Sequence, residues 1–303
     1  PDQRVVYAAT TAARRVDPDY TNVLLLENTS KGYRYTLTGQ AQKLFDFGLN
    51  ASVAYTYGVA RDLNSGLSST ALSNWEFNQV YGSPNDPTLS YAAFDVRHRI
   101  IATGGYTFRY ANKRLATTIS AVYEGQSGSP FTYLYGQGGL DLNNDGAFSN
   151  DLFYIPRNQS EILLTPGSGD TRTVDQIWTD LNNFIESDEY LRTHRGSYAE
   201  RNGPRTPFTH KVDVRLAQDI NFEAGGKTNT LQITLDVLNF GNLLNNDWGR
   251  QYFVNNQSYQ VARVERFQNG QPVISFPNIK QAYDVSAFAS RWQMQLGVRY
   301  SFN

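Results

Sequence analysis

The chain has 303 residues, enough for one large domain or two ordinary ones, and its 27 Lys and Arg against 28 Asp and Glu give a net charge of -1. This balance provides no basic surface for nucleic acid, and the absence of cysteine excludes a disulfide framework and thiolate chemistry. The mean hydropathy of -0.50 and the short longest apolar run, Val23–Leu26, exclude transmembrane helices.

Seven segments alternate apolar and polar residues along the chain. In the clearest, Phe47 to Val59, the odd positions are apolar or aromatic and the even positions are small or polar. A period of two places one face of a strand against an apolar medium and the other against water. The segments are residues 30–43, 47–59, 97–108, 115–124, 211–222, 230–236 and 291–302. Six of the seven are long enough to supply the roughly 9 to 11 residues of a tilted membrane strand plus some overhang, which predicts an all-β, antiparallel transmembrane β-barrel.

The connections between these segments alternate strictly in length. Residues 44–46, 110–113 and 223–227 are tight turns, whereas 60–95, 126–208 and 241–288 are long. Outer-membrane barrels place short turns in the periplasm and long loops outside the cell, so we expect extracellular long loops and a periplasmic C-terminus. A soluble barrel is the alternative, but soluble barrels rarely combine such long strands with three long loops on one rim.

The last segment has the pattern of a bacterial closing strand, with apolar or aromatic residues at each even position from Trp292 to Phe302. Seven strands do not close a single-chain bacterial barrel of even strand number. Residues 5–8 would supply an eighth strand but form a short run without clean alternation. No apolar signal region follows Pro1–Arg4. We therefore expect residues 1–303 to be the C-terminal seven or eight strands of one larger barrel.

The longest connection, residues 126–208, contains helical spacing at 174–191, with apolar Val174, Ile177 and Leu181 and acidic residues between them. We expect a short amphipathic helix in an extracellular loop, acting as a lid or, alternatively, binding a partner. The aromatic segments 131–135 and 75–77 are candidates for a ligand platform, and packing between loops explains them equally well.

The same connection contains a candidate calcium site. Asp141, Asn143 and Asp145 place oxygen ligands at alternate positions before Gly146, as in a loop that wraps Ca²⁺. The twelfth position is leucine, and the acidic residue Asp151 comes one place early. The alternative is a surface turn rich in Asn, Asp and Gly without metal. A calcium ion here would hold the loop in place rather than catalyse, and no cofactor is required.

Two histidines, His98 and His210, lie near the long-loop ends of predicted strands, with Asp95 close to the first. No serine lies two residues from either histidine, and nothing in the sequence indicates a catalytic triad, so we expect no enzyme. Six basic residues occupy the alternate strand positions that form the polar face. There they would guide an anionic ligand, dock a plug or pair with carboxylates of the same face. They are Arg34, Arg97, Arg99, Lys211, Arg215 and Arg299.

Four segments resemble the C-terminal barrel of TonB-dependent outer-membrane receptors, particularly the Oar-like group of Bacteroidota-type bacteria. They are DVRHR at 95–99, YEGQSGSPFT at 123–132, LDVLNFGN at 235–242 followed by DWG at 247–249, and LGVRYSF at 296–302. Together with the loop at Asp141, they span most of the chain from about residue 30 onward.

The resemblance implies a barrel of about 22 strands in outer-membrane lipid and lipopolysaccharide, which imports a bulky nutrient such as a peptide, glycan or chelate. It also implies a plug that contacts TonB, which this sequence does not contain, and recognition of Gly297, Tyr300 and Phe302 by the barrel-assembly machinery. The alternative function is a scaffold barrel in a surface, secretion or assembly complex, with a lipoprotein or other envelope protein as partner.

Overall fold

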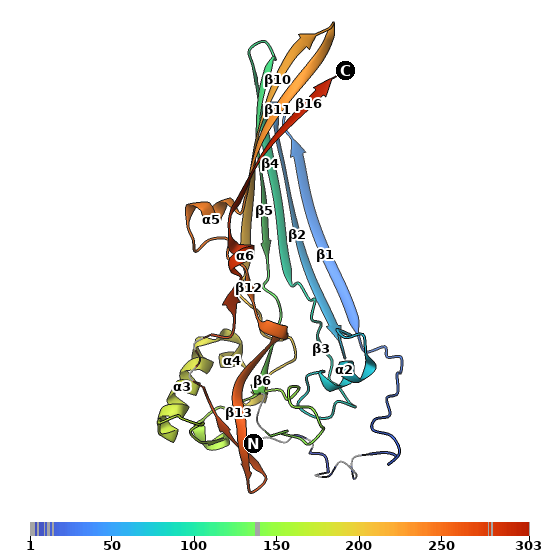
Figure 1. The fold of residues 1–303 in the computed structure, drawn as a ribbon, viewed down its shortest axis with the longest axis vertical. Helices are drawn as coiled ribbons and strands as arrows, with labels where there is room; N and C mark the ends of the chain where they lie inside the picture. Colours follow the sequence, from blue (N-terminus) through green and yellow to red (C-terminus); the bar gives the residue numbers. More distant parts are fainter. Residues whose placement is uncertain are drawn as a thin grey trace.

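A computed structural model describes residues 4–302 except 5, 9, 11, 12, 14, 137–139, 278 and 280. Seven long antiparallel strands form one sheet in sequence order (Figure 1). They are β1 (Tyr33–Leu44), β2 (Leu49–Asp62), β4 (His98–Tyr110), β5 (Leu115–Gln126), β10 (Thr209–Ala224), β11 (Lys227–Leu238) and β16 (Gln293–Phe302). Each coincides with one alternating segment, with ends a few residues apart. The predicted strands and their antiparallel order are confirmed.

Short and long connections lie at opposite ends of this sheet (Figure 1). The turn after β10 is made by Gly225 and Gly226, whose φ angles of 63° and 76° suit glycine. Phe302 pairs with Asn229, close to this turn, so the C-terminus lies at the short-turn end as predicted.

The sheet is open. In the parts of the chain that the structure describes, β1 pairs with β2 and β16 pairs with β11, and neither has a partner on its other side. The suggested eighth strand at residues 5–8 is wrong for the three of these residues that are described: they form no strand, and the Tyr7 N–H donates instead to the Asn143 carbonyl at 2.7 Å. No described helix is long and apolar enough to cross a membrane.

The second and third long connections fold together into one lobe beyond the end of the sheet. Its own sheet has the order β6 (Thr132–Gly136), β13 (Ser258–Gln268), β14 (Gln271–Ser275) and β8 (Leu163–Leu164). Strands β6 and β13 pair in parallel although more than a hundred residues separate them. The helices of the lobe are α3 (Val174–Ser187) and α4 (Glu189–Thr193).

The remaining elements are short. The first connection holds α2 (Ala71–Glu76) and β3 (Ser90–Tyr91), and the second holds β7 (Tyr154–Ile155), β9 (Ser197–Tyr198) and the 3₁₀ turn η1 (Gln159–Glu161). The third holds α5 (Phe240–Leu244), β12 (Tyr252–Phe253), the 3₁₀ turn η2 (Asn255–Gln257), β15 (Asp284–Val285) and α6 (Ala287–Ser290).

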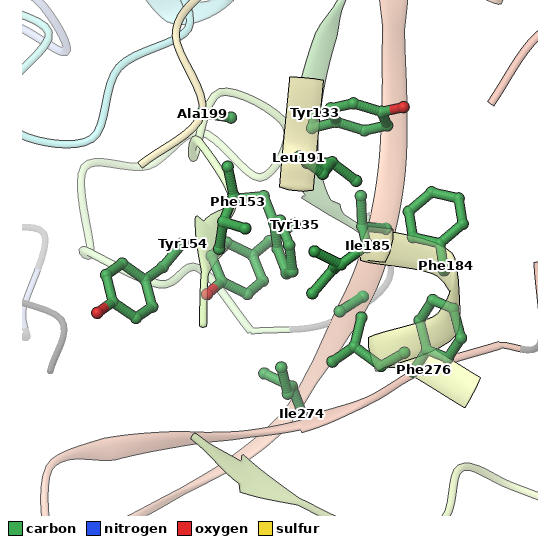
Figure 2. Close-up of a cluster of buried hydrophobic side chains, with 14 of the residues drawn as sticks. Tyr133, Tyr135, Phe153, Tyr154, Phe184, Ile185, Leu191, Ala199, Ile274 and Phe276 are labelled. Atoms are coloured by element: carbon green, nitrogen blue, oxygen red, sulfur yellow. The ribbon is translucent and has the colours of Figure 1, made fainter. Parts of the chain in front are cut away.

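The lobe contains a buried aromatic and aliphatic core, shown in Figure 2. Tyr133 and Phe131 of the predicted aromatic platform are 0% and 1% exposed, so the platform hypothesis is wrong for residues 131–135 and packing between loops is observed. The helix predicted at 174–191 is confirmed, although it is divided into α3 and α4 at Asp188. Its apolar face, with Ile177 and Leu181, is buried in the core and is therefore not free to bind a partner.

Candidate functional site

The register of the long strands places all the alternating apolar positions on one face of the sheet. In the middle, Leu216 lies between Ile119 and Leu235, and Leu235 in turn pairs with Leu296. Aromatic rings flank this aliphatic band at both ends of the strands. At the loop end they are Tyr33, Tyr35, Tyr55, Tyr57 and Tyr123, and at the turn end Phe47, Tyr106, Phe108, Phe222, Tyr300 and Phe302. Two aromatic girdles around an aliphatic band are typical of a membrane-facing barrel wall.

The two histidines belong to the girdle at the loop end. His98 Nδ1 lies 2.8 Å from the Tyr55 hydroxyl, and His210 Nδ1 lies 2.8 Å from the Tyr123 hydroxyl. The nearby carboxylate Asp95 is 2% exposed and binds Arg205 and the Ala60 N–H rather than a histidine. Among the described residues, the histidines therefore have the surroundings of rim residues and no catalytic dyad.

The opposite face of the sheet is polar and carries paired charges. Arg99 lies 2.6 Å from Glu124, and Arg215 donates to both carboxylate oxygens of Asp236, with Nη2 to Oδ2 at 2.9 Å. Lys211 Nζ lies 3.7 Å from Asp213. Arg34 and Arg299 lie on the same face, on the two edge strands β1 and β16. The structure thus pairs three of the six predicted basic residues with carboxylates of the same face.

Arg97, the sixth, lies at the rim in a cluster that ties the first long connection to the end of the sheet. Its guanidinium stacks 4.6 Å from the Tyr91 ring centre, and that of Arg61 lies 4.1 Å from the same ring. Burial alone would raise the pKa of Tyr91, but the adjacent Arg61 and Arg97 hold it below its ordinary value. Arg205 binds the buried carboxylate of Asp95, which also lies 3.7 Å from Arg97. Sequence reasoning placed Arg97 on the polar face and missed this cluster.

The residues of the predicted calcium loop form consecutive tight turns. Asp141 accepts N–H bonds from Asn143 (3.3 Å) and Gly146 (2.8 Å), and Asp145 accepts one from Ala147 (2.7 Å). Asp151 is buried and binds Arg4 at 2.7 Å. Burial, opposed by Arg4 and reinforced by the charges of Asp145 and Asp141, raises the pKa of Asp151 to about 7.

The fit of this loop to a cation is partial. The carboxylates lie near enough to raise the pKa of Asp151, and the buried Asn150 Oδ1 has no hydrogen-bond partner in the described structure. Against this, no three acidic, histidine or cysteine side chains among the described residues converge as metal ligands. The loop as observed satisfies most of its carboxylate oxygens with its own N–H groups.

Two of the segments that carry the family resemblance close the junction between the sheet and the long connections. Asn239, at φ 52° after β11, is 2% exposed and donates from Nδ2 to the carbonyls of Gly249 and Ser290 at 3.0 and 2.7 Å. At Gly128, a Cβ would lie 2.0 Å from the Thr206 carbonyl oxygen, so only glycine allows this close approach. These residues hold the connections at the end of the sheet.

The predicted assembly residues lie on the edge strand β16. Tyr300 and Phe302 are 53% and 75% exposed on the apolar face, and the Tyr300 hydroxyl donates to Asn229 Oδ1 at 2.7 Å. Gly297 is on the polar face opposite Thr234. The aromatic pair is therefore accessible at the short-turn end of the sheet.

All three long connections line one large cleft that sequence reasoning missed. Its volume is about 1010 Å³, and its walls come from residues 64–79 and 93, from 149 and 201–202, and from 254–260, 277 and 279. Nine of the described lining residues are Asn or Gln, and Phe77 and Tyr259 add aromatic surface. The only signal in the sequence was the abundance of Asn, Ser and Gln at residues 64–79 and 255–260.

A family model described as outer membrane beta barrel domain matches residues 2–261. The match includes six of the seven long strands, the first two long connections and part of the third. No curated protein matches the chain, and no solved structure matches it.

Proposed function

Because the chain belongs to the outer membrane beta barrel domain family, we propose that it forms the wall and external lobe of a TonB-dependent receptor of the outer membrane that imports a bulky nutrient. The observation that carries this proposal is the cleft of about 1010 Å³, built by all three long connections at one end of a sheet with one apolar and one polar face. A cleft of this size at the loop end of the wall is large enough to hold a ligand before import. The four segments that resemble Oar-like receptors favour the TonB-dependent class, in which a plug makes the contact with TonB.

The proposal includes a barrel larger than this sheet. An open sheet edge is not stable in hydrocarbon, because each unpaired backbone N–H or C=O group there costs about 2 kcal/mol or more. The free sides of β1 and β16 therefore require further strands, which the family resemblance puts at about 22 in total. The polar face, with Arg99, Arg215 and their carboxylates, then lines the lumen against a plug.

The partners follow from this arrangement. The apolar face and its girdles contact lipid and lipopolysaccharide, the accessible Tyr300 and Phe302 bind the barrel-assembly machinery, and TonB binds through the plug. The exposed lobe offers a surface for a lipoprotein or another envelope protein. The long connections lie outside the cell in this orientation.

Uptake in the native bacterium tests the proposal. Cells are grown on single nutrients with the intact gene, with the gene deleted and with the TonB-contacting segment of the receptor removed. We expect growth on one bulky nutrient to be lost in both altered strains and restored by the intact gene. Unchanged uptake after removal of the TonB-contacting segment, together with co-purification in a stable envelope complex, would instead establish the scaffold function.

A further inference from the structure

The cleft between the three long connections is almost free of charged side chains and is rich in primary amides. Arg201 is the single charged side chain among its described lining residues. Its Nη2 donates to the Asp62 carboxylate at 2.7 Å and to the Asp62 carbonyl at 2.6 Å, so its charge is already paired. An ionised ligand would lose part of its hydration here without gaining a free counter-charge, which disfavours its binding.

The amides of the cleft are held in place by the backbone of neighbouring loops. Asn78 donates to the Leu63 carbonyl at 3.0 Å, Asn202 to the Tyr91 carbonyl at 2.8 Å, and Gln257 to the Ala93 carbonyl at 3.0 Å. Asn74 already uses both N–H donors and its acceptor within its own loop, on the Ser68 and Thr70 carbonyls and the Ser68 N–H. Each of the other three bonds uses one N–H of a group that has two N–H donors and a carbonyl acceptor. The cleft therefore presents oriented donors and acceptors that lose little side-chain entropy when a ligand binds.

Apolar surface lies beside these amides. Phe77, directly after α2, is 56% exposed, and Leu67 is 73% exposed on the same wall. Tyr259 and Ile279 contribute from the third connection. A ligand that suits this lining has uncharged hydroxyl or amide groups on its edges and apolar C–H faces that pack on a ring.

We propose that this cleft binds a neutral oligosaccharide, an inference that rests on the proposed receptor function and names its ligand class. Sugar rings combine hydroxyl edges with apolar faces and carry no charge. The volume is at the upper end of the ~300–1,000 Å³ typical of small-molecule sites, which favours several linked units over one. A peptide is disfavoured, because its termini and charged side chains lack partners here. The neighbouring strand β6 is also not open to a peptide strand, because it pairs with β13 on one side and with residues 151–153 on the other.

Binding is measured with the full-length protein purified in detergent, without TonB or a membrane potential. The probes are neutral gluco-, xylo- and manno-oligosaccharides, the corresponding uronic-acid oligosaccharides and neutral hexapeptides, each by calorimetry. We expect at least one neutral oligosaccharide to bind, and Phe77→Ala to raise its Kd about tenfold through loss of the stacking face. The matched control is Phe288→Ala, an exposed phenylalanine that lines a separate small cleft and should leave the Kd within about twofold.

Three results would overturn the inference: no binding by any neutral oligosaccharide, preference for uronic acids or peptides, or an equal effect of the two phenylalanine variants. Gln257→Ala provides a second test inside the cleft, with an expected loss of about fivefold or more in affinity. Because these measurements need no energised transport, oligosaccharide binding without TonB-dependent uptake would remove the proposed function and leave the ligand class intact. TonB-dependent uptake of a different nutrient, with no oligosaccharide bound in the cleft, would support the receptor function and contradict the ligand class.

Discussion

Single side chains join parts of the lobe that are distant in sequence, and Asp188 is the clearest case. Its carboxylate caps α4 by accepting the Leu191 N–H at 2.8 Å, and it also accepts the hydroxyl of the fully buried Tyr133 at 2.7 Å. Burial and this neighbouring carboxylate raise the pKa of Tyr133 far above its ordinary value, so the phenol stays a donor at all physiological pH. One residue thus fixes both the break between two helices and the position of β6.

Replacing Asp188 with alanine is expected to destabilise the lobe by about 2–4 kcal/mol. The loss combines a helix cap, about 1 kcal/mol, with a buried hydroxyl left without an acceptor, about 1–3 kcal/mol. Hydrogen exchange of the α3 amides measures the local free energy of opening. Asp188→Asn keeps an acceptor oxygen and should recover most of the stability; equal exchange in both variants would show that the acceptor is unimportant.

Calcium at the Asp141 loop stays a prediction. The alternating ligands and the buried Asn150 Oδ1 favour it, whereas the bonds that the carboxylates already accept disfavour it. We expect Ca²⁺ in the ~0.1–1 mM range typical of extracellular sites to raise the melting temperature of the lobe. The increase should be absent with Mg²⁺ and in Asp145→Ala. A melting temperature independent of Ca²⁺ in the intact protein would identify the loop as a metal-free turn.

At the scale of elements, what the sequence predicts depends on how local the signal is. The strands were predicted almost to their ends, because alternation within one strand reports which face meets lipid. The lobe was not predicted, because β6 and β13 are more than a hundred residues apart in the sequence. No local pattern indicates that Ser258 pairs with Thr132. The aromatic run at 131–135 was visible in the sequence, but its burial depends on helices and strands supplied by two other segments.

The same locality explains the outcome for the candidate sites. The alternation placed Arg99 and Arg215 on the polar face, and the strand register brings each within reach of a carboxylate on the neighbouring strand. The cleft could not be predicted, because its amides come from three separate connections and are aligned only by bonds such as that from Gln257 to Ala93.

The assignment of faces makes a direct prediction for neighbouring residues on β16. Leu296 is on the apolar face opposite Leu235, and Gln295 is on the polar face opposite Asp236. Leu296→Arg is expected to cost about 2–4 kcal/mol in a lipid bilayer, whereas Gln295→Arg, near a carboxylate, should cost less than about 1 kcal/mol. Urea unfolding of the protein in lipid vesicles measures both. Equal costs, or a reversed order, would contradict the membrane orientation of the sheet.

At the scale of the whole molecule, the open sheet requires a partner along both edges. The central strands β5 and β10 have neighbours on each side, but β1 and β16 expose one row of backbone groups each within the described structure. Hydrocarbon offers no water to satisfy these groups, so the same sequence is stable in a membrane only within a closed wall. This physical requirement, rather than the family resemblance, is the strongest argument for a larger barrel.

Hydrogen exchange tests that requirement strand by strand. We consider the backbone N–H groups of β1 and β16 that point away from the sheet. In the full-length protein in lipid, we expect them to be protected from exchange about as strongly as the backbone N–H groups of β5 and β10. In residues 1–303 alone in detergent, the two edges should exchange at least tenfold faster than the centre, because their outward N–H groups have no acceptor. Fast exchange at both edges in the full-length protein would mean that the sheet stays open. The edges at β1 and β16 would then face water rather than lipid or further strands, and the apolar girdles would need another explanation.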